Sequence, residues 1–143
     1  MKEQINVSCS VDNLKKIRDF ISQSLGEYMP NKDKEMVVLA IDEICANLIC
    51  HCHYPHKTHI SVHVVKNELR NEFEFLIKNR GDQFDYGSYS EPTLSEIVKQ
   101  KRKGGMGMML VRRIMDDIDF FQEGGINVCK LVKKSSIPFK KGD

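Results

Sequence analysis

The segment from Val37 to His51 constrains the fold more than any other stretch, because as a helix it is apolar on almost every side. A helix of that kind is usually buried between layers rather than laid on a surface. Its apolar members are Val37, Val38, Ala40, Ile41, Ile44, Cys45, Leu48 and Ile49. The rest of the chain must therefore cover this helix from more than one direction.

A single polar line interrupts the helix. Glu43, Asn47 and His51 are spaced four residues apart, so they lie on one face. Burying a carboxylate is costly unless it has a partner. A carboxylate one turn from a carboxamide suits a divalent cation, or a base beside a ligand oxygen. From this segment alone two interpretations stay open: a functional site, or a buried polar stripe satisfied by backbone groups and water.

Length and composition favour one globular domain. The 143 residues suffice for a full core, and 41% hydrophobic and 29% charged residues are ordinary for such a domain. The net charge of +2 is too small to indicate nucleic acid or a membrane surface as a partner. No apolar run approaches the roughly 20 residues that span a bilayer, and the first residues do not resemble a secretory signal. We therefore expect a cytoplasmic protein whose five cysteines are reduced thiols.

Hydrophobic periodicity predicts the order β-α-α-β-β-loop-α-β-β. Helices on one face of a mostly antiparallel sheet satisfy this order, which gives an α+β fold, a two-layer α/β sandwich. The expected strands are 5–9, 58–66, 71–78, 119–121 and 126–132, and the expected helices are 11–25, 32–52 and 108–115. The last two strands form a hairpin that turns at Gly124-Gly125.

Two stretches fall outside these elements. Residues 79–103 have little apolar content and can carry a short helix near 94–100; so long a loop in a compact domain is usually functional. Residues 135–143 are polar and basic, and we expect them to form a poorly ordered tail after a single domain of residues 1–134.

The segment Gly104-Gly105-Met106-Gly107 stands at the expected start of a helix. Glycines let the backbone approach an anion, and a helix N-terminus offers free N–H groups and a favourable dipole. Residues 101–103 add positive charge just before it. The segment predicts a phosphate-binding loop, although a glycine-rich turn can also be only a turn. It is not a Walker A loop, and it does not follow a strand directly as a Rossmann phosphate loop would.

A third segment, residues 77–85, ends a strand and begins a polar turn with Gly81. In this order the three segments resemble the N, G1 and G2 boxes of the GHKL (Bergerat-fold) ATPases. The short single-domain form is most similar to the anti-sigma-factor serine kinases of bacterial partner-switching systems, over about Ile5 to Val132. The resemblance implies the histidine-kinase-type ATPase fold, ATP and Mg²⁺ as cofactors, and a homodimer. It also implies two protein partners, a sigma factor and an antagonist (anti-anti-sigma) protein that the kinase phosphorylates.

The resemblance implies roles for individual residues. Glu43 would be the general base that polarises the attacking serine hydroxyl, and Asn47 would coordinate Mg²⁺. His51 would support the nucleotide helix, while Asn79 and Gly81 would lie at the adenine. The residues that would hold the phosphates at the helix start are Lys103, Gly104, Gly105, Met106, Gly107 and Met108. Residues 79–103 would form the ATP lid.

Two positions depart from the family's pattern. Asn79 stands where an aspartate usually accepts a hydrogen bond from the adenine amino group, and Gln83 stands where a glycine is usual. A carboxamide oxygen can accept the same bond but lacks the charge, so weaker ATP binding is expected.

Three functions therefore stay open. The first is a serine/threonine kinase that phosphorylates the antagonist and sequesters the sigma factor. The second is a nucleotide-binding or degenerate partner-switch module without kinase activity, which Asn79 favours. The third is the isolated catalytic domain of a histidine kinase; against it, the chain opens directly on a strand.

Other residue clusters have ordinary explanations. A possible metal cluster comprises Cys50, His51, Cys52, His53, His56, His59 and His63, but none of the usual zinc spacings is present. Residues 99–103 could contact nucleic acid, but no aromatic residues are interleaved with the charges. Core packing is the favoured interpretation for the side chains of Met108 and Met115.

Overall fold

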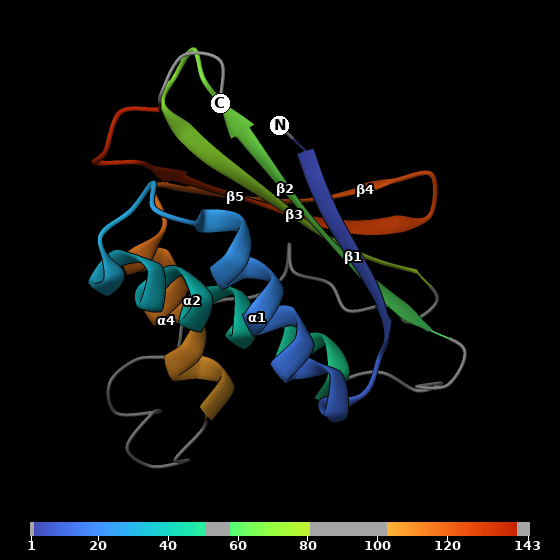
Figure 1. Cartoon of the computed structure of the whole chain (residues 1–143). Coiled ribbons are helices and arrows are strands. Elements are labelled where there is room, and N and C mark those ends of the chain that lie inside the picture. The colour runs from blue at the N-terminus through green and yellow to red at the C-terminus, as the bar shows by residue number, and fades with distance from the viewer. Residues whose placement is uncertain (1, 51–57, 81–102, 140–143) are drawn as a thin grey trace.

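One antiparallel sheet and the helices on one of its faces make up the part of the chain that the structure describes (Figure 1). The structure, a computed structural model, describes residues 2–50, 58–80 and 103–139, with the backbone only at 80 and 103–106. The strands are β1 (Lys2–Ser8), β2 (His59–Asn67), β3 (Glu72–Arg80), β4 (Asp117–Glu123) and β5 (Ile126–Lys134). The helices are the 3₁₀ turn η1 (Val11–Asn13), α1 (Leu14–Leu25), α2 (Asn31–Cys50) and α4 (Lys103–Ile114). The predicted α+β fold is confirmed.

The strands lie side by side in the order β1-β2-β3-β5-β4, and every neighbouring pair is antiparallel. The last strand along the chain therefore lies inside the sheet, between β3 and β4. The turn that joins β4 to β5 is at Gly124 and Gly125, as predicted, with φ angles of 58° and 79°. Two consecutive residues with positive φ are the requirement of a tight type I′ hairpin turn, and glycine meets it without strain.

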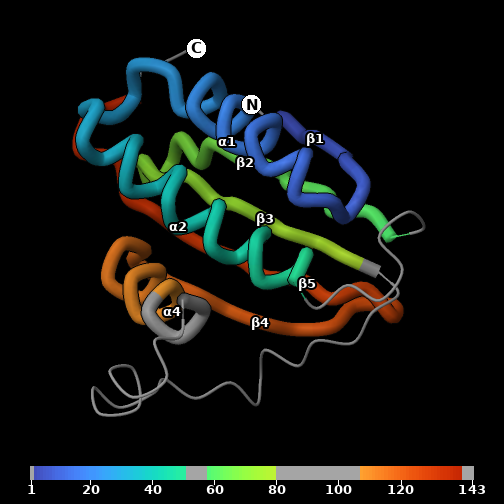
Figure 2. Tube along the Cα trace, turned by 90° about the horizontal axis from the view of Figure 1, so that it is seen from below, coloured from blue at the N-terminus to red at the C-terminus, as the bar shows by residue number. Residues whose placement is uncertain are grey.

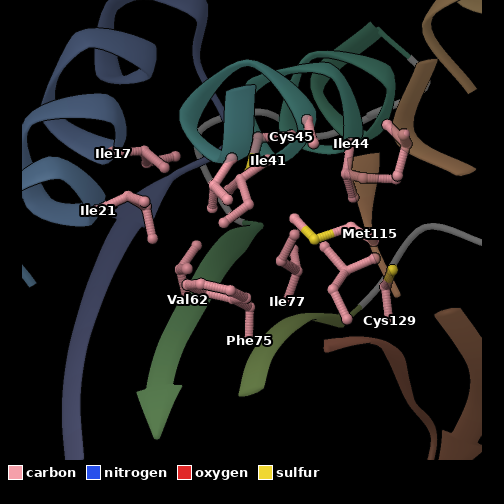
Figure 3. Close-up of a cluster of buried hydrophobic side chains, with 14 of the residues drawn as sticks. Ile17, Ile21, Ile41, Ile44, Cys45, Val62, Phe75, Ile77, Met115 and Cys129 are labelled. Carbon is pink, nitrogen blue, oxygen red and sulfur yellow. The ribbon is translucent and has the colours of Figure 1, made fainter. Parts of the chain in front are cut away.

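The position of α2 between other elements explains why the segment from Val37 is apolar on almost every side. Figure 2 shows α2 between α1 and α4, with the sheet behind all three helices. Its fully buried residues are Val37, Ala40, Ile41, Ile44, Cys45 and Leu48. They meet Ile17 and Ile21 of α1 and the sheet residues Val62, Phe75 and Ile77 in one core (Figure 3). A helix flanked on two sides and packed on a sheet needs apolar residues around most of its circumference.

The predicted element boundaries were wrong at two places that bear on function. β3 continues to Arg80, so Asn79 lies within the strand and pairs with Ile60 and Asn127 on its two neighbours. Helix α4 begins at Lys103 rather than at Met108, so the glycine segment is part of the helix instead of a loop before it. Partner strands and a neighbouring helix, which local periodicity does not report, extend both elements.

The predicted tail is also corrected in part. Residues Ser135 to Phe139 fold back on the body of the protein, where the Phe139 ring lies 5.2 Å from that of Phe73 and 5.3 Å from that of Tyr28. Asn71 accepts a hydrogen bond from the backbone N–H of Phe139 at 2.7 Å. Residues 140–143, the stretch near 94–100 and most of the expected lid lie outside the described residues.

In the ranges that the structure describes, no helix is both long enough and apolar enough to cross a membrane.

Candidate functional site

Helices α2 and α4 meet closely at Glu43 and Gly107. If Gly107 were an alanine, its Cβ would lie 2.8 Å from Cδ of Glu43 and closer still to Oε2. A side chain at position 107 would force the end of the flexible Glu43 side chain to move, so glycine allows the Glu43 carboxylate to lie against the backbone of α4. The structure thus brings together two residues that the sequence places in separate motifs.

The polar line on α2 is accessible rather than buried. Glu43 and Asn47 are both half-buried, one turn apart, while Ile44, Cys45 and Leu48 beside them are fully buried. Both side chains therefore keep a surface that a ligand could reach. His51, the third member of the line, lies outside the described residues.

The first turn of α4 comprises Lys103, Gly104, Gly105 and Met106, and it contains no acidic residue. The first N–H groups of a helix have no acceptor within the helix, and the dipole there favours an anion. The glycine segment was expected just before a helix that begins at Met108, and it lies in the first turns of that helix instead. Met108 is only 2% exposed and its side chain is part of the core, which leaves its backbone alone to face a ligand.

Asn79, predicted at the nucleotide base, is 3% exposed on the helix-facing side of β3. Its Oδ1 accepts a hydrogen bond from Nδ2 of Asn127 at 3.2 Å. Oδ1 of Asn127 in turn accepts from Nε2 of Gln122 at 2.8 Å. The carboxamide oxygen that we expected at the adenine is therefore already bonded within the sheet, and Gly81, its expected neighbour, lies outside the described residues.

Sequence reasoning did not find Asn127 and Gln122. Both lie on the last hairpin, and only the pairing of β5 with β3 brings Asn127 opposite Asn79. Figure 2 shows the carboxyl ends of α2 and β3 at the same end of the molecule, and Asn47 and Asn79 belong to the carboxyl-terminal halves of these two elements. A search for amide residues at the turn-proximal end of each predicted strand would have found this group.

The described residues fit the nucleotide and the Mg²⁺ ion that the resemblance implies. The carboxamide oxygen of Asn47 is a hard ligand, and Mg²⁺ keeps most of its waters, so one protein ligand is sufficient. Gly107 leaves the space that a Cβ would fill beside Glu43. The N–H groups of the first turn of α4, which have no acceptor within the helix, suit phosphate oxygens.

A separate groove lies between α1 and α2. It has a volume of about 520 Å³, and its lining includes Asp42, Leu39 and Arg18. Arg18 bonds to Asp42 across the two helices at 2.9 Å. Asp42 therefore takes part in helix packing, although it is the immediate neighbour of Glu43.

The cysteines and histidines do not form a metal site in the part of the chain described here, where no group of three or more His, Cys, Asp or Glu residues could hold a metal ion. The described cysteines, Cys9, Cys45, Cys50 and Cys129, are free thiols, as predicted. Burial, the larger effect, and the nearby Asp42 carboxylate raise the pKa of the Cys45 thiol.

Comparison with known proteins identifies the family. The family model described as the histidine kinase-like ATPase domain matches residues 7–133. The chain therefore belongs to the histidine kinase-like ATPase family, as the three motifs indicated.

The individual proteins that this chain resembles share only a modest part of its sequence. The chain is similar to the serine-protein kinase RsbW of Staphylococcus aureus strain bovine RF122, with 27% identity over 115 residues that cover 73% of this chain and 70% of the relative. The RsbW of strain MSSA476 is 25% identical over 114 residues, with the same coverage. A solved structure of the RsbU and RsbW domains of Rv1364c from Mycobacterium tuberculosis matches 99% of this chain with a TM-score of 0.67 and 14% identity. The chain spans only 35% of that longer protein, and the match shows a common fold.

Proposed function

We propose that this protein is an anti-sigma factor that transfers a phosphoryl group from ATP to a serine or threonine of a small antagonist protein. The observation that carries the proposal is the contact between Glu43 and Gly107, which joins a candidate base to the helix that would hold the phosphates. The membership of the histidine kinase-like ATPase family and the similarity to proteins named serine-protein kinase support it.

In this mechanism Glu43, Asn47 and the start of α4 have separate roles. Glu43 accepts the proton of the attacking hydroxyl, and the backbone N–H groups at the start of α4 bind phosphate oxygens. Asn47 would hold a Mg²⁺ ion, which would neutralise charge on the transferred group. Phosphoryl transfer needs positioning and electrostatic stabilisation more than covalent help from the protein, so few side chains are enough.

The substitution Glu43→Ala tests this assignment. We expect it to abolish phosphoryl transfer while nucleotide affinity, measured by titration calorimetry with Mg²⁺, changes by no more than a few-fold. Asp42→Ala is the matched control, because it removes an adjacent carboxylate that faces the α1–α2 groove instead of α4. Equal losses of binding and transfer in Glu43→Ala would show that Glu43 is a structural residue.

A second function, nucleotide binding without kinase activity, is favoured by Asn79. Its oxygen is bonded to Asn127, so the usual acceptor for adenine is weakened. This function predicts Mg²⁺-dependent binding that is lost in Asn47→Ala, with no transfer to any antagonist protein. Calorimetry with and without Mg²⁺, followed by a phosphoryl-transfer assay, separates the two functions.

The proposal extends to the partners and the location. We infer a sigma factor and an antagonist protein as partners, a homodimer as the active assembly, and the cytoplasm as the location. Sedimentation velocity tests the homodimer directly. A single species with the mass of one 16.5 kDa chain at micromolar concentration would contradict it.

A further inference from the structure

The sheet has a second face that no helix in the described ranges covers. Helices α1, α2 and α4 all lie on one side of the sheet (Figure 2). Successive residues of a strand point to opposite faces, so Leu76, between the core residues Phe75 and Ile77, points away from the helices. The strand register extends this alternation to the whole sheet, and the apolar residues of this outer face are Val65, Leu76, Phe121, Val128 and Val132.

Most apolar residues of the outer face lie on the interior strands. A strand with one face in water normally alternates apolar and polar residues. The interior strands depart from this alternation, because each carries neighbouring apolar residues that point to both faces: Val64 and Val65 on β2, Leu76 and Ile77 on β3, Leu131 and Val132 on β5. The edge strands β1 and β4 instead place exposed polar residues on the outer face, namely Lys2, Gln4, Asn6, Asp117 and Asp119. A polar rim around a more apolar centre is the usual composition of a protein interface.

Two charged residues make the centre of the outer face complementary to itself. Glu74 and Lys78 lie on this face of β3, on either side of Leu76. When two such faces meet across a two-fold axis that crosses β3 at Leu76, Glu74 of each copy lies opposite Lys78 of the partner subunit. Lys130, which is paired with Leu76 in the strand register, has its Nζ 4.0 Å from Oε1 of Glu74 in its own chain. A two-fold interface requires such self-complementarity, because the same surface serves both copies.

We propose that a second copy of this chain packs its outer face against this one, with the two-fold axis at Leu76 and two ion pairs between Glu74 and Lys78. The inference rests on the proposed function, because it names the interface of the homodimer proposed there. Val65 and Leu76 are half-buried and Phe121 is 38% exposed, so all three keep surface for a partner. Five strands about 4.8 Å apart and about seven residues long give a face of roughly 24 Å by 24 Å, which is comparable with the ~800 Å² per partner of a standard interface.

Sedimentation velocity of the full chain at micromolar concentrations, with Leu76→Lys beside the wild type, tests the proposal. We expect the wild type to sediment as a dimer. In Leu76→Lys two ammonium groups meet at the axis, and we expect the dissociation constant of the dimer to rise about 100-fold or more. Leu69→Lys makes the same change at a leucine that is 99% exposed outside this face, and it should leave the dimer intact. The midpoint of urea unfolding of each variant shows whether it is folded.

Charge reversal tests the pairing without changing the apolar centre. Glu74→Lys and Lys78→Glu each place like charges opposite each other, and we expect each to raise the dissociation constant about tenfold. The double variant Glu74→Lys/Lys78→Glu restores opposite charges across the axis, so it should dimerise more tightly than either single variant. A double variant no tighter than the single variants overturns the inference.

The outcomes separate this inference from the proposed kinase function. A wild-type dimer that Leu76→Lys leaves unchanged overturns the inference alone. A wild-type monomer overturns it together with the proposed homodimer. Phosphoryl transfer is assayed separately, so a dimer that depends on Leu76 but transfers no phosphoryl group contradicts the kinase function and supports the interface.

Discussion

At Gly107 the packing of two helices and the position of the candidate base depend on one missing side chain. The carboxylate of Glu43 lies where a Cβ at position 107 would be, so a side chain at that position would displace the end of Glu43. Residues that share a contact in this way have non-additive effects on stability.

Gly107→Ala measures this dependence. We expect the added methyl group to displace the Glu43 carboxylate and to lower transfer activity, while the free energy of unfolding changes by about 1 kcal/mol or less because the end of the Glu43 side chain can move. The double variant Gly107→Ala/Glu43→Ala should be at least as stable as Gly107→Ala, since the shorter side chain leaves room. Urea denaturation gives the free energies, and Arg113→Ala, an exposed position of the same helix, is the control. If the changes in unfolding free energy caused by Gly107→Ala and Glu43→Ala simply add in the double variant, the two residues are not in contact.

His63 gives a prediction about pH. Burial is the first cause that lowers its pKa below 6.5, and the positive charges of Lys78 and Lys2 lower it further. Its Nδ1 is buried without a hydrogen-bond partner in the part of the chain described here. The unfolded chain therefore binds a proton more readily than the folded one, and stability falls as the pH drops from about 6.5 through the pKa of the folded state.

The substitution His63→Leu should flatten that part of the stability profile. The measurement is the midpoint of urea unfolding at pH 7.5 and pH 5.5 for both proteins. The wild-type midpoint should fall more between the two pH values than the midpoint of the variant. If the midpoints of both proteins fell by the same amount, the loss of stability in acid would come from groups other than His63.

At the scale of elements, local pattern identified the helices and strands but not the contacts that complete the site. The apolar residues of α2 and the glycine pair of the last hairpin specify their structures within a few residues of sequence, so both were predictable. The start of α4 depends on its packing against α2, and the extension of β3 depends on pairing with strands on both sides. The bond between Asn79 and Asn127 joins residues 48 positions apart, and no local signal reports it.

Asn71 is the residue that fixes the C-terminal segment to the sheet. It precedes β3 with a φ of 53°, and its side-chain amide donates to the carbonyls of Ser135 and Ile137 at 3.1 and 3.3 Å. We expect Asn71→Gly, which tolerates this φ, to lose about 1–2 kcal/mol of unfolding free energy through the missing hydrogen bonds. Asn71→Ala should lose more, because alanine is strained at positive φ. Urea unfolding measures which of the two variants loses more unfolding free energy. Equal losses would mean that the positive φ at position 71 does not destabilise alanine relative to glycine.

At the scale of the whole molecule, the sheet depends on its last strand. β5 lies between β3 and β4, so a chain that ends at Gly125 lacks an interior strand and leaves β4 without its partner. We expect this fragment to show no cooperative unfolding in urea, in contrast to a chain that ends at Phe139. A cooperative transition in the shorter fragment would mean that the helices and β1 to β3 form an independent unit.

This strand order also has a consequence for biosynthesis. The ribosome makes α2 and β3 early, but the strand that covers the open edge of β3 is made last. Until then the nascent chain carries Phe73, Phe75 and Ile77 on a strand with one unpaired edge, which is a template for association with other chains. The protein must therefore complete nearly its whole synthesis before it gains the architecture that holds Asn79, and its dependence on chaperones should be greatest just before β5 emerges.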